Sequence, residues 1–230
     1  MLVIRDAMNI VEATLTDSLE SEVDSAVTKR LESNINLEIG DFAEEDAELA
    51  KHYVIPDTKY ANSVGSERVK AIKDYTAGSE INGKLIEVEG DPNMLPSNFR
   101  KEYTMLMSLK GKVPLPEEHH TYSGTGTFNP MDATENGIFE TPAFMSTSLS
   151  MKVAVKTTNY RRDNAHEEED HVLHFILPKG YTGCYYVAHY SHDPEELEML
   201  IFPKERFKHV SSQKLMLGGV TRHVHTFEPV

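Results

Sequence analysis

Two glutamates, Glu196 and Glu198, have the residue type and the spacing that could do chemistry. They lie in the segment 194–203, where apolar residues separate and follow them. If this segment is a strand, its period of two places both carboxylates on one face and the apolar residues on the other. Like charges at that distance repel, and each raises the pKa of the other. Carboxylate pairs in clefts do acid and base work or stabilise a cationic transition state, whereas an exposed strand edge that carries glutamates is the alternative.

Hydroxyl side chains follow one another in a second segment, 141–150. The segment is a predicted strand in which Phe144 precedes Ser146, Thr147 and Ser148. A triplet of this kind is most often a turn or a helix cap, so it predicts little by itself.

Glycines end a third segment, 119–126. Tyr122, Ser123, Gly124 and Thr125 lie where this predicted strand ends. Because glycine has no Cβ, the backbone there can approach a ligand closely and expose its N–H groups. Taken alone, the segment could equally be a tight hairpin.

Taken in chain order, the three segments resemble the signature regions of the arginine-type mono-ADP-ribosyltransferases, with Tyr-x-Gly at 122–124, Phe-x-Ser-Thr-Ser at 144–148 and Glu-x-Glu at 196–198. The resemblance spans about residues 66–230. It implies an α+β fold, an ADP-ribosyltransferase-like core of two packed, mainly antiparallel β-sheets with flanking helices, preceded by helices. It also implies that the chain uses NAD as a substrate, without a metal, to modify a protein on arginine and release nicotinamide.

The same resemblance implies roles for single residues. Glu198 is the central catalytic residue, because a carboxylate beside the ribose stabilises the positive charge that develops there. Glu196 engages the incoming guanidinium and helps to remove its proton. Ser146 positions Glu198, and Tyr190 contacts the protein substrate together with Glu196. The implied cofactor-binding residues are Tyr122, Ser123, Gly124, Thr125, Phe144, Ser146, Thr147 and Ser148.

The first signature region departs from the family at Ser123. Most arginine-type members have an arginine there that contacts a phosphate of NAD. Losing a charged hydrogen bond of about 1.5–3 kcal/mol would weaken NAD binding. Another cation could take its place, and the candidates are Arg100, Lys101, Arg161, Arg162 and either His119 or His120.

Among family members, the Tyr-Ser-Gly form of the first region is most similar to the Alt-type enzymes of tailed bacteriophages, which modify host proteins. This similarity implies a host protein partner, such as RNA polymerase or a translation-associated factor, and a location in the host cytoplasm or packaged in the virion. Two alternatives stay open. One is a catalytically weakened interaction module on the same fold, and the other is an NAD glycohydrolase.

Helices and strands must hold these residues, and the hydrophobic pattern predicts where they lie. Helices are predicted at 66–77, 96–109 and 150–157. The second half is predicted to be mostly sheet, with strands near 119–124, 142–148, 171–177, 183–189, 196–202, 205–210 and 220–228.

The first 50 residues contain thirteen acidic and three basic residues. Apolar residues recur there every four positions, at Leu15, Leu19, Val23, Val27 and Leu31, as in an amphipathic helix. We therefore expect an acidic helical extension over 1–60, with a connection near 38–62, and a catalytic domain over 61–230. The extension either packs on that domain or binds a partner.

Composition excludes several classes of function. A net charge of −14 argues against direct nucleic-acid binding, which needs a basic surface. No apolar stretch is long enough to span a bilayer, and the charged N-terminus does not resemble a signal peptide, so we expect a soluble, unexported protein. The single cysteine, Cys184, is expected to pack in the core. His223 and His225 are expected to be surface or packing residues and not metal ligands. The acidic run 167–170 is expected to be a solvated loop.

Overall fold

The computed structural model describes residues 29, 31, 42–53, 65–125, 134–165 and 170–230, with only the backbone described at 53 and over 160–165. The chain separates into two units, Met1–Asn36 and Leu37–Val230. In the first unit, Lys29 and Leu31 are helical, and the rest of the predicted apolar stripe lies outside the described residues. The second unit contains every element discussed below.

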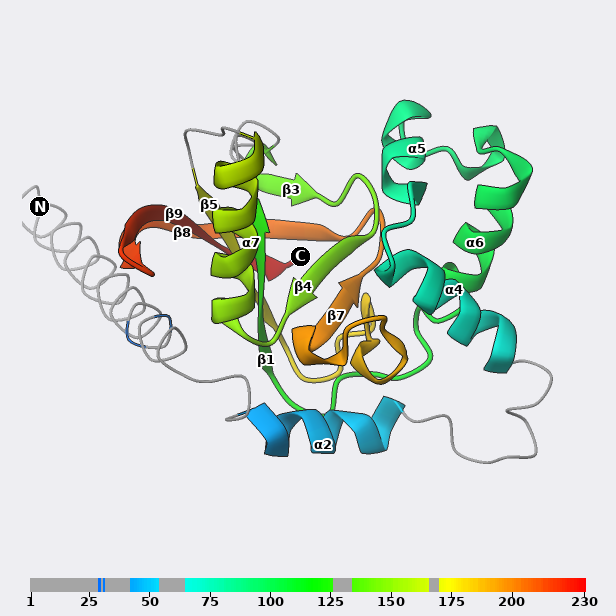
Figure 1. The fold of residues 1–230 in the computed structure, drawn as a ribbon, viewed down its shortest axis with the longest axis horizontal. Helices are drawn as coiled ribbons and strands as arrows, with labels where there is room; N and C mark the ends of the chain where they lie inside the picture. The colour runs from blue at the N-terminus through cyan, green and yellow to red at the C-terminus, as the bar shows by residue number, and fades with distance from the viewer. Residues whose placement is uncertain (1–28, 30, 32–41, 54–64, 126–133, 166–169) are drawn as a thin grey trace, which may run out of the picture. The chain divides into compact units, whose positions relative to one another are not determined.

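Three helices of the second unit form one group, α4, α5 and α6, while α7 lies apart from them against the sheet (Figure 1). The helices expected at 66–77 and 96–109 are confirmed as α4 and α6, and the one expected at 150–157 is longer than predicted. Helix α5 was not expected, and α2 lies within the extension 1–60 that was expected to be helical. The helices are α2 (Ala43–Tyr53), α4 (Ser66–Thr76), α5 (Ile81–Glu87), α6 (Ser97–Met107) and α7 (Met151–Ala165), with short 3-10 helices η3 (Pro92–Met94), η5 (Ala188–Tyr190) and η6 (Pro194–Glu196).

Nine strands form the sheet, in the order β2-β3-β8-β9-β5-β1-β4-β7-β6. Only the pairing of β5 with β9 is parallel among the described strands. The strands are β1 (His119–Thr125), β2 (Thr134–Glu135), β3 (Ile138–Glu140), β4 (Met145–Ser148), β5 (His171–Leu177), β6 (Cys184–Tyr186), β7 (Glu198–Ile201), β8 (Arg206–Leu217) and β9 (Val220–Pro229).

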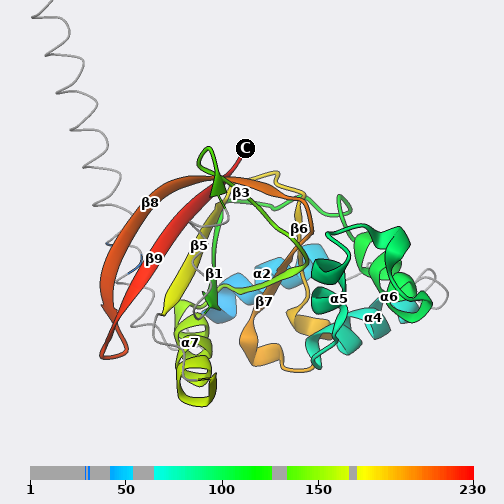
Figure 2. The same cartoon turned by 90° about the horizontal axis from the view of Figure 1, so that it is seen from above.

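The α+β fold class is confirmed, but the two expected sheets are continuous. Hydrogen bonds join all nine strands into one sheet, and Figure 2 shows that it is strongly curved. β1 and β4 share a single register pair, Tyr122 with Ser148. We call this pair the seam, because it joins a part of six strands to a part of three. Sequence patterns predict strands but not whether two groups of strands share an edge.

Helix α7 contacts β1, β4 and β5. Its approach to β1 is very close, because a Cβ atom at Gly124 would lie 2.1 Å from the carbonyl oxygen of Ala154. Only glycine can occupy a position where another backbone comes this near. Gly124 therefore lets α7 lie directly against the backbone of β1.

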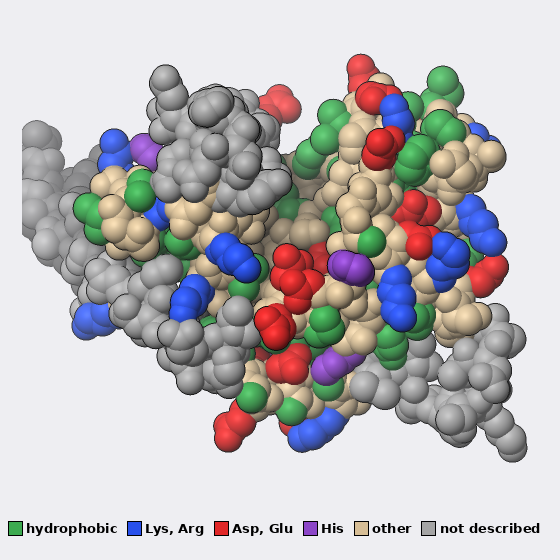
Figure 3. Space-filling model, in the orientation of Figure 1, with side chains coloured by type: hydrophobic (Ala, Val, Ile, Leu, Met, Phe, Trp, Pro, Cys, Tyr) green, Lys and Arg blue, Asp and Glu red, His purple; other side chains and the backbone are tan. Residues whose placement is uncertain are grey.

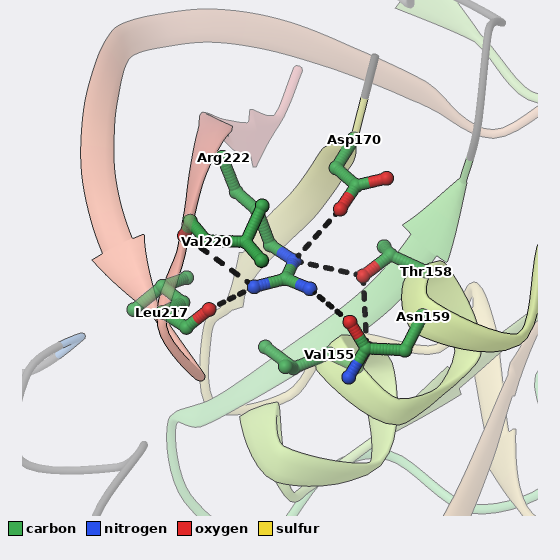
Figure 4. A network of polar contacts seen from close by, with 7 residues as sticks. All are labelled: Val155, Thr158, Asn159, Asp170, Leu217, Val220 and Arg222. Atoms are coloured by element: carbon green, nitrogen blue, oxygen red, sulfur yellow. Dashed lines mark hydrogen bonds and ion pairs between the residues drawn. The ribbon is translucent and has the colours of Figure 1, made fainter. Parts of the chain in front are cut away.

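A buried arginine on β9 ties the same helix to β9 and to Asp170, which precedes β5 (Figure 4). Arg222 has no exposed surface, and its Nε lies 2.9 Å from Thr158 Oγ1 and 3.3 Å from Asp170 Oδ2. Its other nitrogens donate to Asn159 Oδ1 and to the carbonyl of Leu217. The expectation of a solvated loop is thus wrong for Asp170, which is buried against this guanidinium; residues 167–169 lie outside the described residues.

Helix α2 occupies the stretch in which a connection was expected, and it packs against β6. Glu45 Oε1 lies 2.8 Å from Nδ1 of the buried His119 on β1. Asp46 accepts a hydrogen bond from the hydroxyl of Tyr186 on β6. These contacts make α2 part of the second unit.

The remaining expectations concern the cysteine, a metal site and membrane-spanning segments. Cys184 is buried, as expected, and burial raises the pKa of its thiol. No group of three or more histidine, cysteine or acidic residues in the described ranges could hold a metal ion. None of the helices described here is long and apolar enough to cross a membrane.

Replacing Arg222 by methionine tests the buried network. The change leaves Asp170 buried without this guanidinium, so we expect the free energy of unfolding to fall by about 3–5 kcal/mol, measured by urea denaturation. Arg206→Met is the control, because Arg206 is exposed on β8. Equal stability of the two variants would contradict a stabilising role for the network.

Candidate active site

A cavity of about 240 Å³ lies beside the seam. It brings together all three segments that sequence analysis selected, together with one face of α7. We call it the seam pocket. Its lining residues are Tyr122, Ser123, Gly124, Ser146, Thr147, Ser148, Val153, Ala154, Thr157, Glu196 and Glu198.

Glu198 is the most buried acid of this pocket. It begins β7, pairs in register with Ser148 and is only 4% exposed. Burial raises the pKa of its carboxyl from 4.5 to about 7, a hydrogen bond with Ser146 opposes the rise, and the charge of Glu196 adds to it. A carboxyl held near neutrality in a pocket can change its protonation during a reaction, as functional carboxylates do.

Ser146 is itself held by side chains from the helical group. Its Oγ lies 3.1 Å from the hydroxyl of Tyr75 on α4, which accepts a hydrogen bond of 3.1 Å from Asn82 Nδ2 on α5. Burial raises the pKa of Tyr75 to about 12, so its hydroxyl keeps its proton. Tyr75 and Asn82 therefore support Ser146, and through it Glu198.

Tyr75 and Asn82 were not among the predicted site residues. Tyr75 lies on the buried face of α4, together with Ala71 and Ile72. A tyrosine on a buried face nevertheless needs a partner for its hydroxyl, and this requirement was the available signal. Nothing in the sequence identifies Ser146 as that partner.

Glu196 reaches the pocket by a route that differs from the prediction. It ends η6 and does not belong to the strand, and the next residue, Leu197, has a left-handed backbone with φ of 48°. The predicted alternation from 196 to 202 is therefore wrong, because the chain turns between the two glutamates. β7 is also buried on both faces, since all four of its residues, Glu198–Ile201, are buried. Burial and Asp193 raise the pKa of Glu196, whereas Lys156 lowers it.

A second cavity, of about 590 Å³, adjoins the seam pocket. The two share Val153, Thr157 and Glu196. We call it the outer pocket; one wall carries Lys152 and Lys156, and the other carries acidic residues of the η6 turn. Figure 3 shows acidic side chains over η6 and β7 facing basic side chains over α7.

Three predicted site residues line neither pocket. Thr125 and Phe144 are absent from both linings, and Phe144 packs edge-on against Tyr75, Tyr103 and Phe202. Tyr190 is part of η5 and packs against the core.

Four of the cations proposed to replace the missing arginine line neither pocket. Arg100 donates to the carbonyls of Asn93 and Leu95, and Lys101 pairs with Glu67 at 3.0 Å. His119 contacts Glu45, and His120 contacts His174. The side chains of Arg161 and Arg162 lie outside the described residues. Lys152 and Lys156 are the cations that line the outer pocket among the described residues.

Comparison with solved structures shows a shared fold. Plx2a, an ADP-ribosyltransferase toxin from Paenibacillus larvae, has a TM-score of 0.62 at 18% identity, covering 81% of this chain and 96% of its own. The C3 exoenzyme of Clostridium limosum has a TM-score of 0.61 at 17% identity, covering 84% and 95%. The Vis toxin, an ADP-ribosyltransferase from Vibrio splendidus, has a TM-score of 0.58 at 18% identity, covering 86% and 90%.

Comparison of the sequence with protein families identifies the family as well as the fold. No curated protein sequence matches the chain significantly. Residues 52–225, however, match the family model for the ADP-ribosyltransferase exoenzymes. This match includes every residue that lines the seam pocket. The chain therefore belongs to the ADP-ribosyltransferase exoenzyme family and is an NAD-dependent transferase.

Proposed function

We propose that this chain transfers ADP-ribose from NAD to an arginine side chain of a protein, with Glu198 as its catalytic residue. One observation carries the proposal. A buried carboxylate, hydrogen-bonded to Ser146, shares a pocket with a second carboxylate that precedes it by two positions. Such a pair can stabilise a cationic sugar and receive a cationic acceptor.

The reaction breaks the bond between the ribose C1′ and the nicotinamide nitrogen, and the electron pair leaves with nicotinamide, which becomes neutral. Positive charge then develops on the ribose ring. Glu198, when ionised, stabilises that charge at close range inside a poorly solvated pocket. Ser146 holds the carboxylate in one orientation, and Tyr75 and Asn82 hold Ser146.

Glu196 suits the acceptor side of the reaction. Its carboxylate lines both pockets, so it faces the seam pocket and the larger space from which an acceptor would arrive. A guanidinium group pairs well with carboxylates. One guanidinium nitrogen forms the new bond to C1′, and its proton passes to Glu196, which is partly buried and has a raised pKa.

Lys152 and Lys156 provide the positive charge that the diphosphate of NAD requires. The seam pocket, at about 240 Å³, is smaller than the roughly 300–1,000 Å³ of typical ligand sites. The described residues that line it include two carboxylates and no cation. The nicotinamide ribose fits there, and the diphosphate would extend past Val153 and Thr157 toward the lysines.

The Alt-type resemblance at 122–124 supports a bacterial host protein as the acceptor. Agmatine, a small guanidinium compound, is bound in a solved structure of Vis, and a structurally similar protein from S. aureus has been solved with NAD. Agmatine is therefore a suitable acceptor probe for this chain.

Glu198→Gln keeps the side-chain shape and removes the charge. We expect kcat for nicotinamide release to fall at least about 100-fold. The pKa of Glu198 is about 7 in the folded chain and 4.5 in the unfolded chain. Its ionisation therefore has no effect on stability below pH 4.5, destabilises the fold increasingly between pH 4.5 and 7, and has its full effect above pH 7. The variant should thus gain thermal stability at about pH 8 and none at about pH 4, measured by calorimetry. Near-normal turnover would contradict the catalytic assignment.

Glu196→Gln should separate acceptor chemistry from NAD cleavage. We expect transfer to agmatine to fall at least about tenfold, because the proton acceptor is lost, while NAD hydrolysis changes less than about threefold. Transfer is measured with radiolabelled NAD, and a bacterial lysate replaces agmatine to find a protein target. Equal loss of both activities would contradict the acceptor role.

Two further outcomes of that experiment point to other functions. Nicotinamide release by the unaltered chain with no labelled acceptor would favour an NAD glycohydrolase. Binding of a lysate protein with no cleavage of NAD would favour an interaction module.

Lys156→Gln tests the position of the diphosphate. Losing a charged hydrogen bond should raise KM for NAD about tenfold, with little change in kcat. Lys208→Gln is the matched control, because Lys208 is exposed on β8 and lines neither pocket. If both variants keep the KM of the unaltered chain, the diphosphate binds elsewhere.

A further inference from the structure

A row of side chains crosses the sheet on the level of the seam. Glu198 on β7 pairs in register with Ser148 on β4, which pairs with Tyr122 on β1. Tyr122 pairs with His174 on β5, and His174 pairs with Thr226 on β9. Residues opposite one another on neighbouring strands have their side chains in contact. The row therefore links the carboxylate of the pocket to a buried histidine on the other part of the sheet.

His174 is fixed at both ring nitrogens. It has no exposed surface, its Nδ1 lies 3.1 Å from Thr226 Oγ1, and its Nε2 lies 2.8 Å from Nδ1 of His120. His120 Nε2 faces Glu118 Oε1 at 3.4 Å. If the hydroxyl of Thr226 donates to His174, then His174 can donate to His120 and His120 to the carboxylate. In this order both imidazoles are neutral and each of these hydrogen bonds has one donor and one acceptor. The ring of His174 is therefore held at both of its nitrogens.

Tyr122 lies flat on this imidazole. The ring centroids are 5.0 Å apart and the planes differ by 12°. Tyr122 is only 1% exposed, yet it lines the seam pocket. Since β1 and β4 share just one register pair, few backbone hydrogen bonds hold Tyr122 beside Ser148. Side-chain packing behind Tyr122 must therefore help to hold it beside Ser148.

We propose that His174 is a positioning residue: by fixing the ring of Tyr122 at the seam, it sets the wall of the pocket that binds the nicotinamide ribose opposite Glu198. The inference rests on the proposed function, because it assumes that the seam pocket binds NAD. His174 touches no substrate and acts through Tyr122.

The same strand provides a matched control. His171 is three positions from His174, so its side chain points to the opposite face of β5. It is equally buried, at 2% exposure, and its Nδ1 lies 3.0 Å from Nε2 of His225. His171 lines neither pocket. A purely structural role for buried histidines in this strand predicts similar effects at both positions.

The test compares His174→Phe with His171→Phe. Each change keeps a ring of similar size and removes hydrogen bonds, so both should lower thermal stability. KM for NAD should rise about tenfold in His174→Phe, with kcat changed less than about threefold. A tenfold rise corresponds to the loss of about one hydrogen bond between NAD and the pocket when Tyr122 is misplaced. His171→Phe should keep the KM of the unaltered chain. Thr226→Val removes one contact of His174 and should raise KM in the same direction by a smaller factor, which keeps the test available if His174→Phe does not fold.

Binding is measured separately by calorimetric titration of NAD into the same proteins carrying Glu198→Gln, where turnover is slow. Equal KM and equal Kd for the His174 and His171 variants would overturn the inference and leave the proposed function intact. A failure of the unaltered chain to bind or cleave NAD would instead overturn the proposed function, and the inference with it.

Discussion

β1 and β4 meet at one register pair, Tyr122 and Ser148, and the geometry of the pocket depends on this meeting. On one side of the pair lie β1, which lines the pocket with Gly124, and α7, which lines it with Val153 and Ala154. On the other side lie β4 and β7, which carry the hydroxyls and Glu198. The parts on both sides are held by continuous ladders, so their internal geometry is firm. Their relative placement depends on the seam, on α7, which contacts both β1 and β4, and on α2, which bonds to His119 on β1 and to Tyr186 on β6.

Burying Glu198 opposes folding, and the surrounding structure offsets this cost. The carboxyl needs a fixed partner in a pocket with little water, and Ser146 provides it. Ser146 is oriented in turn by a tyrosine and an asparagine from two different helices. The helical group therefore does more than cover the core, because its hydrogen bonds to Ser146 support the carboxylate of Glu198. Carboxylates with perturbed pKa values are commonly found where function has been favoured over stability.

Much of this arrangement could be predicted from local pattern. The strand 171–177 was predicted with its correct bounds because its mostly apolar run is too short for a typical helix and ends at Pro178. The three segments selected as candidate site segments line one pocket. The turn between the glutamates was missed, because Pro194 and a left-handed Leu197 break an alternation that looks regular in the sequence. The hairpin of β2 and β3 was also missed, although Asn136 and Gly137, both with positive φ, form the two-residue turn that is typical of a hairpin. The short helix α5 and the contacts of Tyr75 depend on tertiary packing, which no local period encodes.

Gly124 limits how this pocket can change. Any side chain there would push Ala154 away from β1 and move α7, and Val153 and Thr157 would move with it. The wall formed by β1 is thus effectively fixed in position. Under the proposed function, a change of acceptor preference is consequently easiest to produce in the η6 turn, where residues can be exchanged without displacing α7. Redesign of the enzyme for a new target would begin at that turn and leave the strand unchanged.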